Sequence, residues 1–573
     1  MKTLSLLILT VIAGAVMFVS AAAAQVTDWK QIPIPTLPTF HPKEPKRIEL
    51  QNGMVIFLTE DHELPLIDGI ARIRGGSREE PANKAGLVQL YGETWRTGGT
   101  KNQTGDQLDD FLEARAARVE TGDGIDSTTI GWSCLKEDFD DVFKVFLGVL
   151  RDPAFRPDKL DLAQKGAIDA ISRRNDNPLQ IAAREAAKLA YGADSPYVRE
   201  PEYSSVAAVQ QQDFVSWHKQ HLYPNYIILG IAGDFASAQM EARLRQAFGS
   251  WAKGPAWRNP HIEFHPAQPA YYLVDKKDVN QSNIRMVGLG TTRDNPDYYA
   301  IEVFNYAFGG GFSSRLFQDI RTRRGLAYAV GGGIGTAFDH PGLLQMRLGT
   351  KSGTTVEALQ ALYQDIDDVQ KHPIDEEEMK RAKDAILNSF IFNLDTPEKV
   401  LRERMAYEFY GYTADFLERY RAGVEKVTTA DVARVAAKYL HKEQFPVLVV
   451  GNSSEFDKPL SALGPVVPVD TSIPPPSGGK KPAALERENE REHQLNSAVL
   501  TKTTWRPSCS RRTPTLPASF LRRASSLSGG YSDPNFTTGL CSLQPSPKRD
   551  STLGMTRGKS TPGVSCCRLR CLP

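Results

Sequence analysis

The chain has 573 residues, 41% of them hydrophobic, and its 69 lysines and arginines nearly balance 68 aspartates and glutamates. This length is enough for three or more domains. The net charge of +1 implies no basic face, so we expect no nucleic-acid partner.

The first residues have the character of a secretory signal peptide. Lys2 is followed by an apolar run that reaches Val19, and Ala22 and Ala24 fit a cleavage site before Gln25. Residues 1–24 are therefore predicted to be removed, with an uncleaved anchor as the alternative. No later stretch of the sequence is apolar enough to span a membrane. We expect a secreted or periplasmic protein without an integral membrane segment after signal cleavage.

Residues 25–46 are rich in proline and are predicted to form an extended arm. Residues 47–251 then mix strand and helix patterns, which predicts a two-layer α+β domain. Strands are expected at Met54–Thr59, Leu66–Arg74, Thr121–Trp132 and within Tyr226–Phe235. Helices are expected at Gly105–Arg118, Phe139–Leu150, Leu160–Arg174 and Pro178–Tyr191.

The segment Gly86–Thr100 is predicted to be a helix packed on the strands before it. Gln89, Gly92 and Glu93 stand at i, i+3 and i+4 and so share one face of this helix. These three residues form the first candidate site. The apolar residues that recur at helical spacing are Leu87, Val88, Leu90, Tyr91 and Trp95.

Together with the preceding turn G-G-S-R-E-E-P, this helix resembles the zinc-binding segment of the M16 (pitrilysin, insulinase, mitochondrial processing peptidase) family. In that family an inverted H-x-x-E-H motif places two histidines on zinc and a glutamate beside the metal-bound water. The resemblance puts Gln89, Gly92 and Glu93 at those positions. No histidine lies between His62 and His218, so a shift of register cannot restore the motif.

The other zinc ligands are missing as well. A catalytic zinc needs three protein ligands and one open position. By the resemblance, the third ligand would come from residues 155–178, which contain no glutamate, and Asp169 is the nearest substitute. We therefore expect no metal in this chain and interpret Glu93 as a solvated helix residue. A peptidase with an unorthodox metal site is the alternative.

The sequence repeats itself at a nearly constant offset. Val206–Asp213 matches Val424–Asp431, and Gly233 matches Gly451, each 218 residues later. Two copies of one domain are therefore predicted at 47–251 and 269–460, joined by a linker at 252–268. The expected fold class is α+β, with two tandem homologous two-layer α/β domains. The M16 resemblance implies the same arrangement.

The second copy contains a glycine-rich segment, Gly309–Val330, that continues into a helical pattern. It lacks the G-K-[ST] of a phosphate-binding loop. In M16 proteins an arginine and a tyrosine seven residues later hold the substrate backbone in this segment. The resemblance gives these roles to Arg321 and Tyr328, whose donors would polarise a scissile carbonyl and stabilise the oxyanion.

The same resemblance suggests a role for the glycines that open this segment. Gly309, Gly310 and Gly311 would let a substrate peptide approach the main chain closely. The alternative interpretation is purely structural: Arg321 would belong to a solvated basic face and Tyr328 to the core.

From about Pro465 the composition changes. Residues 461–573 contain a Pro-Gly-Lys linker, a charged stretch and five of the six cysteines. We predict no fold for this tail, which has the composition of a frameshifted reading frame. A disulfide-linked appendage is the alternative.

The resemblance implies a role in a two-chain protease. In one bacterial branch of the M16 family, one chain carries H-x-x-E-H and the other carries the arginine–tyrosine pair. This sequence has the pair and lacks the motif, so we expect unfolded peptides as ligands and zinc in a partner subunit. A stand-alone peptide-binding or scaffold protein is the alternative from a binding class.

Overall fold

A computed structural model describes residues 42–475, all of which lie within one compact unit, Met1–Gly529. The predicted signal peptide, residues 25–41 of the predicted arm and residues 476–573 of the predicted tail lie outside the described residues. The first part of that tail is described, and the prediction of no fold is wrong there, because Val466–Pro468 forms a strand that pairs with the strand Tyr271–Asp275. Across residues 42–475, the helices are all too short or too polar to cross a membrane.

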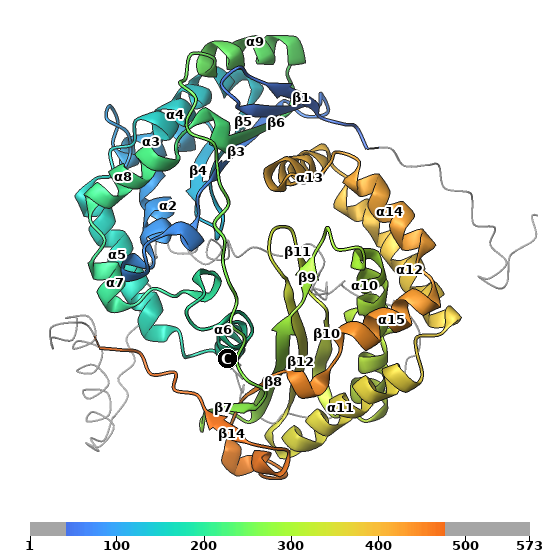
Figure 1. The fold of residues 1–573 in the computed structure, drawn as a ribbon. Coiled ribbons are helices and arrows are strands. Elements are labelled where there is room, and N and C mark those ends of the chain that lie inside the picture. Colours follow the sequence, from blue (N-terminus) through green and yellow to red (C-terminus); the bar gives the residue numbers. More distant parts are fainter. Residues whose placement is uncertain (1–41, 476–573) are drawn as a thin grey trace, which may run out of the picture. The chain divides into compact units, whose positions relative to one another are not determined.

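The first domain is built on a six-stranded sheet with the order β1-β2-β6-β3-β5-β4 (Figure 1). Its strands are β1 Lys46–Glu49, β2 Val55–Glu60, β3 Leu66–Arg74, β4 Arg118–Gly122, β5 Ser127–Leu135 and β6 Ile227–Gly233. Its helices are α2 Leu87–Thr97, α3 Gly105–Glu113, α4 Phe139–Arg151, α5 Pro157–Arg173, α6 Pro178–Tyr191, α7 Tyr203–Ala207, α8 Gln211–His221 and α9 Ser237–Phe248. Most predicted helices are confirmed to within a few residues.

Two predictions in this domain are wrong at the β4–β5 hairpin. The single strand expected at Thr121–Trp132 is an antiparallel pair, in which Gly122 faces Thr129. The turn between the two strands, Gly122 to Asp126, interrupts the alternation of polar and apolar residues, and its Gly and Asp are turn formers. The helix expected to reach Arg118 ends at Glu113, because Arg118 already belongs to β4.

The second domain repeats the design on a sheet with the order β10-β12-β8-β13-β7-β14. Its strands are β7 Tyr271–Asp275, β8 Gln281–Leu289, β10 Ala327–Gly333, β12 Leu343–Lys351, β13 Val447–Gly451 and β14 Val466–Pro468, and β9 Thr291–Thr292 pairs with β11 Thr336–Ala337. Its helices are α10 Tyr298–Asn305, α11 Thr355–Lys371, α12 Glu376–Phe390, α13 Pro397–Tyr410, α14 Phe416–Lys426 and α15 Thr429–Tyr439.

Equivalent elements of the two domains keep the offsets seen in the sequence. Helices α6 and α13 have the same length and start 219 residues apart, each with proline at its first turn after a capping Asn177 or Thr396. Strands β3 and β8 also have equal length. The repeat is therefore structural, and the prediction of two homologous mixed α/β domains is confirmed.

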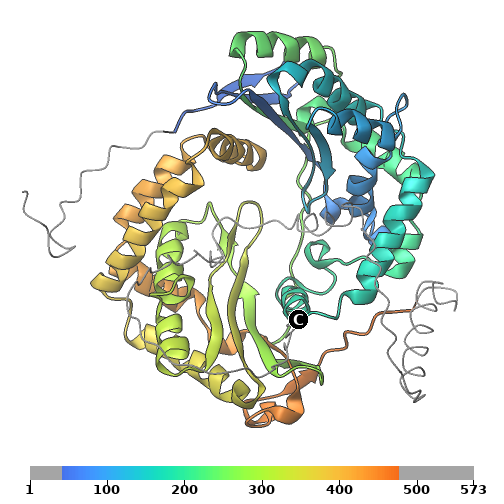
Figure 2. The ribbon, with the colours of Figure 1, turned by 180° about the vertical axis from the view of Figure 1, so that it is seen from behind.

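The two domains exchange one helix each. Helix α13 of the second domain packs on β2 and β6 of the first sheet, and α6 of the first domain packs on β8 and β13 of the second; Figures 1 and 2 show α13 beside the first sheet from both sides. Gly230 permits the first contact, because a Cβ there would overlap Met405 of α13. The apolar residues at these contacts are Val55, Phe57, Ile228, Ala232, Leu401, Met405 and Phe409 in one cluster, and Ile181, Ala182, Ala186, Ala190, Val274, Val287, Leu448 and Val450 in the other.

Candidate functional site

The first candidate site lies on α2, which its apolar face fixes in the core of the first domain. Trp95 is fully buried and its indole Nε1 donates to the carbonyl of Val149 at 2.8 Å. On the other face, the Gln89 amide donates to Glu93 Oε1 at 3.3 Å. Glu93 is exposed, yet the protein around it removes part of its hydration and so raises its pKa, an effect that the nearby Asp123 reinforces.

Gly92 lies against the β4–β5 turn, and this contact limits which side chains position 92 can carry. A Cβ at position 92 would stand 2.9 Å from the main-chain nitrogen of Asp123 and 3.1 Å from its Cβ. Thr121 Oγ1 also donates to the Gly92 carbonyl at 2.7 Å. The turn therefore occupies the space that a glutamate side chain would need in the position between the two motif histidines.

The side chains here do not fit a catalytic zinc. Zinc needs three ligands of the histidine, cysteine or carboxylate type, and α2 offers one carboxylate that is already bonded to an amide donor. Asp169, the substitute suggested by the sequence, is an exposed residue of α5. Among residues 42–475, no three histidine, cysteine or acidic side chains gather closely enough to hold a metal.

The turn before α2 has a structural role that the sequence alone did not reveal. Glu80 is buried and accepts hydrogen bonds from the main-chain nitrogens of Gly86 and Val88, both at 2.9 Å, so it caps the start of α2. A carboxylate in this position also interacts favourably with the helix dipole. The turn is thus needed to hold α2 whether or not the helix binds metal.

Arg78 of the same turn connects the two domains. Its guanidinium lies 2.6 Å from Asp339 of the second domain and 2.9 Å from Glu79, and only 3% of the side chain is exposed. Burial alone would raise the pKa of Asp339, but hydrogen bonds from His340 and Arg78 lower it to about 2. The sequence signal for this contact was only a basic residue in a turn, because its partner lies 261 positions away.

Arg321 and Tyr328, the second candidate site, lie together on the second domain. Arg321 belongs to a π-helical segment, η8 Phe317–Arg323, and Tyr328 to the edge strand β10. The guanidinium carbon is 5.1 Å from the Tyr328 ring centroid and 4.6 Å from that of Phe317. Tyr328 is 82% exposed, so it is not the core residue of the structural alternative.

Both side chains keep their donors free. Within residues 42–475, neither the Arg321 guanidinium nor the Tyr328 hydroxyl has a hydrogen-bond or ion-pair partner. Arg323 and Arg324 instead bond Asp319, at 2.6 and 2.7 Å from its two oxygens. The basic residues of this segment therefore divide into two that hold the fold and one, Arg321, that is available to a ligand.

Two carboxyl groups, Asp319 of η8 and Asp365 of α11, lie where η8 packs on α11. Burial, together with the charge of the nearby Asp319, raises the pKa of Asp365 in α11 to about 8. Asp365 is therefore in its neutral form at pH 7. π-helical segments frequently occur at functional sites, and this one carries Arg321 two residues after Asp319.

The three glycines lie at the end of a second π-helical segment, η7 Tyr306–Gly310. Gly309 is buried, and a Cβ there would stand 2.5 Å from the carbonyl oxygen of Gly332 in β10. It therefore allows η7 to lie against the strand of Tyr328. Gly310 is exposed and Gly311 is half-buried, which leaves their proposed contact with a peptide as a prediction.

Two family models cover most of both domains. "Insulinase (Peptidase family M16)" matches residues 71–194, and "Peptidase M16 inactive domain" matches residues 208–386. This chain belongs to peptidase family M16. Helix α2 lies within the first match, and the segment with Arg321 and Tyr328 lies within the match to the inactive domain.

Several M16 relatives and structures are similar to this chain. An uncharacterized zinc protease of Mycobacterium leprae is 24% identical over 380 residues, which cover 64% of this chain and 83% of the relative. A Helicobacter pylori protein named a non-peptidase homolog is 21% identical, over 71% of this chain and 93% of the relative. The crystal structure of a peptidase M16 inactive domain from Pseudomonas fluorescens matches 73% of this chain and all of its own, with a TM-score of 0.65 and 22% identity.

Proposed function

We propose that this M16 chain is an exported, zinc-free subunit of a heteromeric zinc protease. It would bind unfolded peptide and supply Arg321 and Tyr328 to a partner chain that carries H-x-x-E-H and the metal. The observation that carries the proposal is the contrast between the two sites. Gly92 leaves no room for the catalytic glutamate beside Asp123, whereas Arg321 and Tyr328 lie side by side with free donors.

The chemistry of the pair follows from its donors. The guanidinium has five N–H donors in a rigid fork, and the phenol adds an O–H. Both would bond the carbonyl oxygen of a peptide whose carbon is attacked at the partner's zinc. Donors held in place stabilise the oxyanion as its charge develops, without reorganising during the reaction. The guanidinium of Arg321 lies over the ring of Phe317, and this cation–π contact helps to hold Arg321 in position.

Mixing the purified chain with an M16 protein that carries H-x-x-E-H tests the proposal. The chain alone should bind far less than one zinc per molecule and cleave no peptide, and the mixture should cleave faster than the partner alone. One zinc per chain with chelator-sensitive cleavage would instead establish the unorthodox peptidase. Peptide binding without any effect on a partner's cleavage would favour the stand-alone scaffold, which the non-peptidase name of the Helicobacter pylori relative also suits.

The proposed location rests on the N-terminal sequence. Residues 1–24 have the pattern of a signal peptide but lie outside the described residues. Export would place the chain in the periplasm of a Gram-negative cell or outside the cell. N-terminal sequencing of the exported protein should begin at Gln25, and a mature chain that still begins at Met1 would contradict this part of the proposal.

A further inference from the structure

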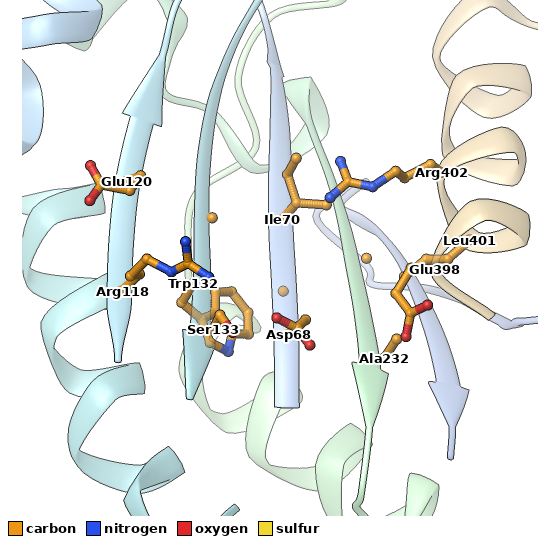
Figure 3. A pocket seen from close by; sticks show the side chains of 13 residues that line it. Asp68, Ile70, Arg118, Glu120, Trp132, Ser133, Ala232, Glu398, Leu401 and Arg402 are labelled. Atoms are coloured by element: carbon orange, nitrogen blue, oxygen red, sulfur yellow. The ribbon is translucent and has the colours of Figure 1, made fainter. Parts of the chain in front are cut away.

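A cavity of about 260 Å³ opens on the face of the first sheet beside α13 (Figure 3). Its floor includes short side chains on the two strands that flank β3: Gly131 and Ser133 of β5, and Gly230 and Ala232 of β6. Leu401 of α13 forms part of one wall. This floor leaves the main chain accessible, as a site for an extended ligand requires.

Five ionisable side chains surround this floor: Asp68, Arg118, Glu120, Glu398 and Arg402. Within residues 42–475, none of them has a hydrogen-bond or ion-pair partner. Elsewhere in the described chain, long charged side chains commonly pair, as Lys399 of α13 does with Asp395 at 2.6 Å. A group of unpaired charges of both signs around one cavity is therefore a feature that ordinary surface pairing does not explain.

The sheet register places these charges in a defined order. Arg118 faces Ser133, Ser133 faces Asp68, and Asp68 faces Ala232 across successive strands. Neighbouring strands lie about 4.8 Å apart, so Arg118 and Asp68 stand about 10 Å from each other at their backbones, with Ser133 between them. Figure 3 shows Asp68 between Arg118 on one side and Glu398 on the other.

Helix α13 supplies the opposite wall. Glu398 and Arg402 are four residues apart and so lie on one face of the helix, and Figure 3 shows Arg402 reaching toward Ile70 and Glu398 toward Ala232. The site thus offers two cations and three carboxylates.

We infer that this cavity binds a polypeptide segment that carries a basic and an acidic side chain near each other. The basic side chain would lie between Asp68 and Glu398, and the acidic one against Arg118 or Arg402. The choice of a peptide rests on the proposed function; the demand for both charges rests on the cavity alone. The cavity would select which segments of an unfolded chain are held, at a place separate from Arg321 and Tyr328.

Titration calorimetry of the full chain with two capped pentapeptides tests this inference. The first is acetyl-Gly-Lys-Ala-Glu-Gly-amide, whose charged side chains share one side when the peptide is extended. The second has glutamine in place of both charged residues. We expect the charged peptide to bind at least tenfold more tightly at low salt, and the difference to shrink as salt screens partly exposed charges.

Variants that each remove one charge from the cavity show where the peptide binds. Glu398→Gln and Arg402→Gln should each weaken the charged peptide about tenfold and leave the neutral peptide unchanged. Lys399→Gln is the matched control, because Lys399 lies on the same helix outside the cavity, and it should bind like the wild type. Equal binding of the two peptides, no binding of either, or equal effects of Lys399→Gln and Arg402→Gln would overturn the inference.

A second measurement separates this inference from the proposed function. Tyr328→Phe should leave the preference for the charged peptide intact, since Tyr328 does not line the cavity. Full partner-dependent cleavage by Tyr328→Phe, with the charge preference retained, would overturn only the proposed function. Partner-dependent cleavage with no charge preference would overturn only the cavity's role.

Discussion

Gly92 of α2 and Asp123 of the β4–β5 turn are so close that a Cβ on Gly92 would lie 2.9 Å from the Asp123 main-chain nitrogen. A main-chain atom cannot move aside as a flexible side chain can. The loss of H-x-x-E-H in this chain is therefore accompanied by a backbone arrangement that excludes the missing glutamate. The helix packs closely on the turn at this glycine and is capped by Glu80, so the segment has a structural role that needs no metal.

Substitution of this glycine by alanine should destabilise the protein. Alanine favours a helix over glycine by about 0.5–1 kcal/mol, but displacing a packed turn costs about 1–3 kcal/mol. We expect Gly92→Ala to lower the melting temperature. Gly166→Ala in α5 is the matched control, because a Cβ there has no neighbour within 4 Å, and it should raise the melting temperature. If the two variants melt alike, the contact with Asp123 is not tight.

The ion pair between Arg78 and Asp339 should contribute strongly to stability. Asp339→Asn leaves a buried guanidinium with Glu79 as its remaining carboxylate, so we expect a loss of about 3 kcal/mol, the lower end for a broken buried pair. Asp141→Asn breaks the exposed Lys144 pair and should cost less than about 1 kcal/mol. Denaturant unfolding measures both, and equal losses would contradict the structural role of Arg78.

Acid should remove the stabilisation that the Arg78–Asp339 ion pair provides. The folded pKa of Asp339 is about 2, below the ordinary value of 3.8, so its ionised form is favoured by folding. The stabilisation is complete above about pH 4 and is lost as the pH falls toward 2. The difference in stability between wild type and Asp339→Asn should therefore narrow across this range.

The elements with strong local signals could be predicted from the sequence. Asn177-Pro178 marks the start of α6 with a cap and a first-turn proline, and the predicted Leu66–Arg74 strand is β3. The β4–β5 hairpin was missed because its turn, centred on Gly124, lies inside an apparently continuous alternation. The packing of α6 and α13 on the sheet of the other domain could not be predicted, because the apolar face of a helix does not indicate which sheet it covers.

The candidate site was predictable only in part. The absence of the H-x-x-E-H residues at Gln89, Gly92 and Glu93 followed from residue identity. The packing of Gly92 on Asp123 did not, because it depends on how a distant hairpin is placed. The family resemblance suggested Arg321 and Tyr328, but whether Tyr328 was exposed or buried needed the structure: β10 is an edge strand and leaves the ring 82% exposed.

The carboxyl pair under η8 should make stability depend on pH in the opposite sense to Asp339. The pKa of Asp365 is raised to about 8 from 3.8, so the folded protein favours its protonated form. Stability is therefore lost as the pH rises from about 4 to 8. Asparagine mimics the protonated acid, and Asp365→Asn should lose less melting temperature between pH 5 and pH 8, by a few degrees.

A control on a neighbouring helix keeps this test specific. Asp384→Asn on α12 changes an exposed carboxyl paired with Lys380 and should follow the wild-type pH profile. If Asp365→Asn and the wild type lose melting temperature equally, Asp365 is ionised in the folded protein and its pKa is not raised.

The measurement that tests the central claim most directly is peptide cleavage by the mixed complex with Arg321→Ala or Tyr328→Phe in this chain. Both variants should fold and assemble, since neither side chain bonds another described residue through a hydrogen bond. Arg381→Ala, an exposed arginine of α12, is the control. Loss of an oxyanion donor should lower kcat by about 10²–10³, and the double variant should lose less than the sum of the two, because both act on one oxygen. Full kcat in both variants would contradict the proposed role of Arg321 and Tyr328. A rise in KM with unchanged kcat would mean that the two residues bind the substrate but do not stabilise the transition state.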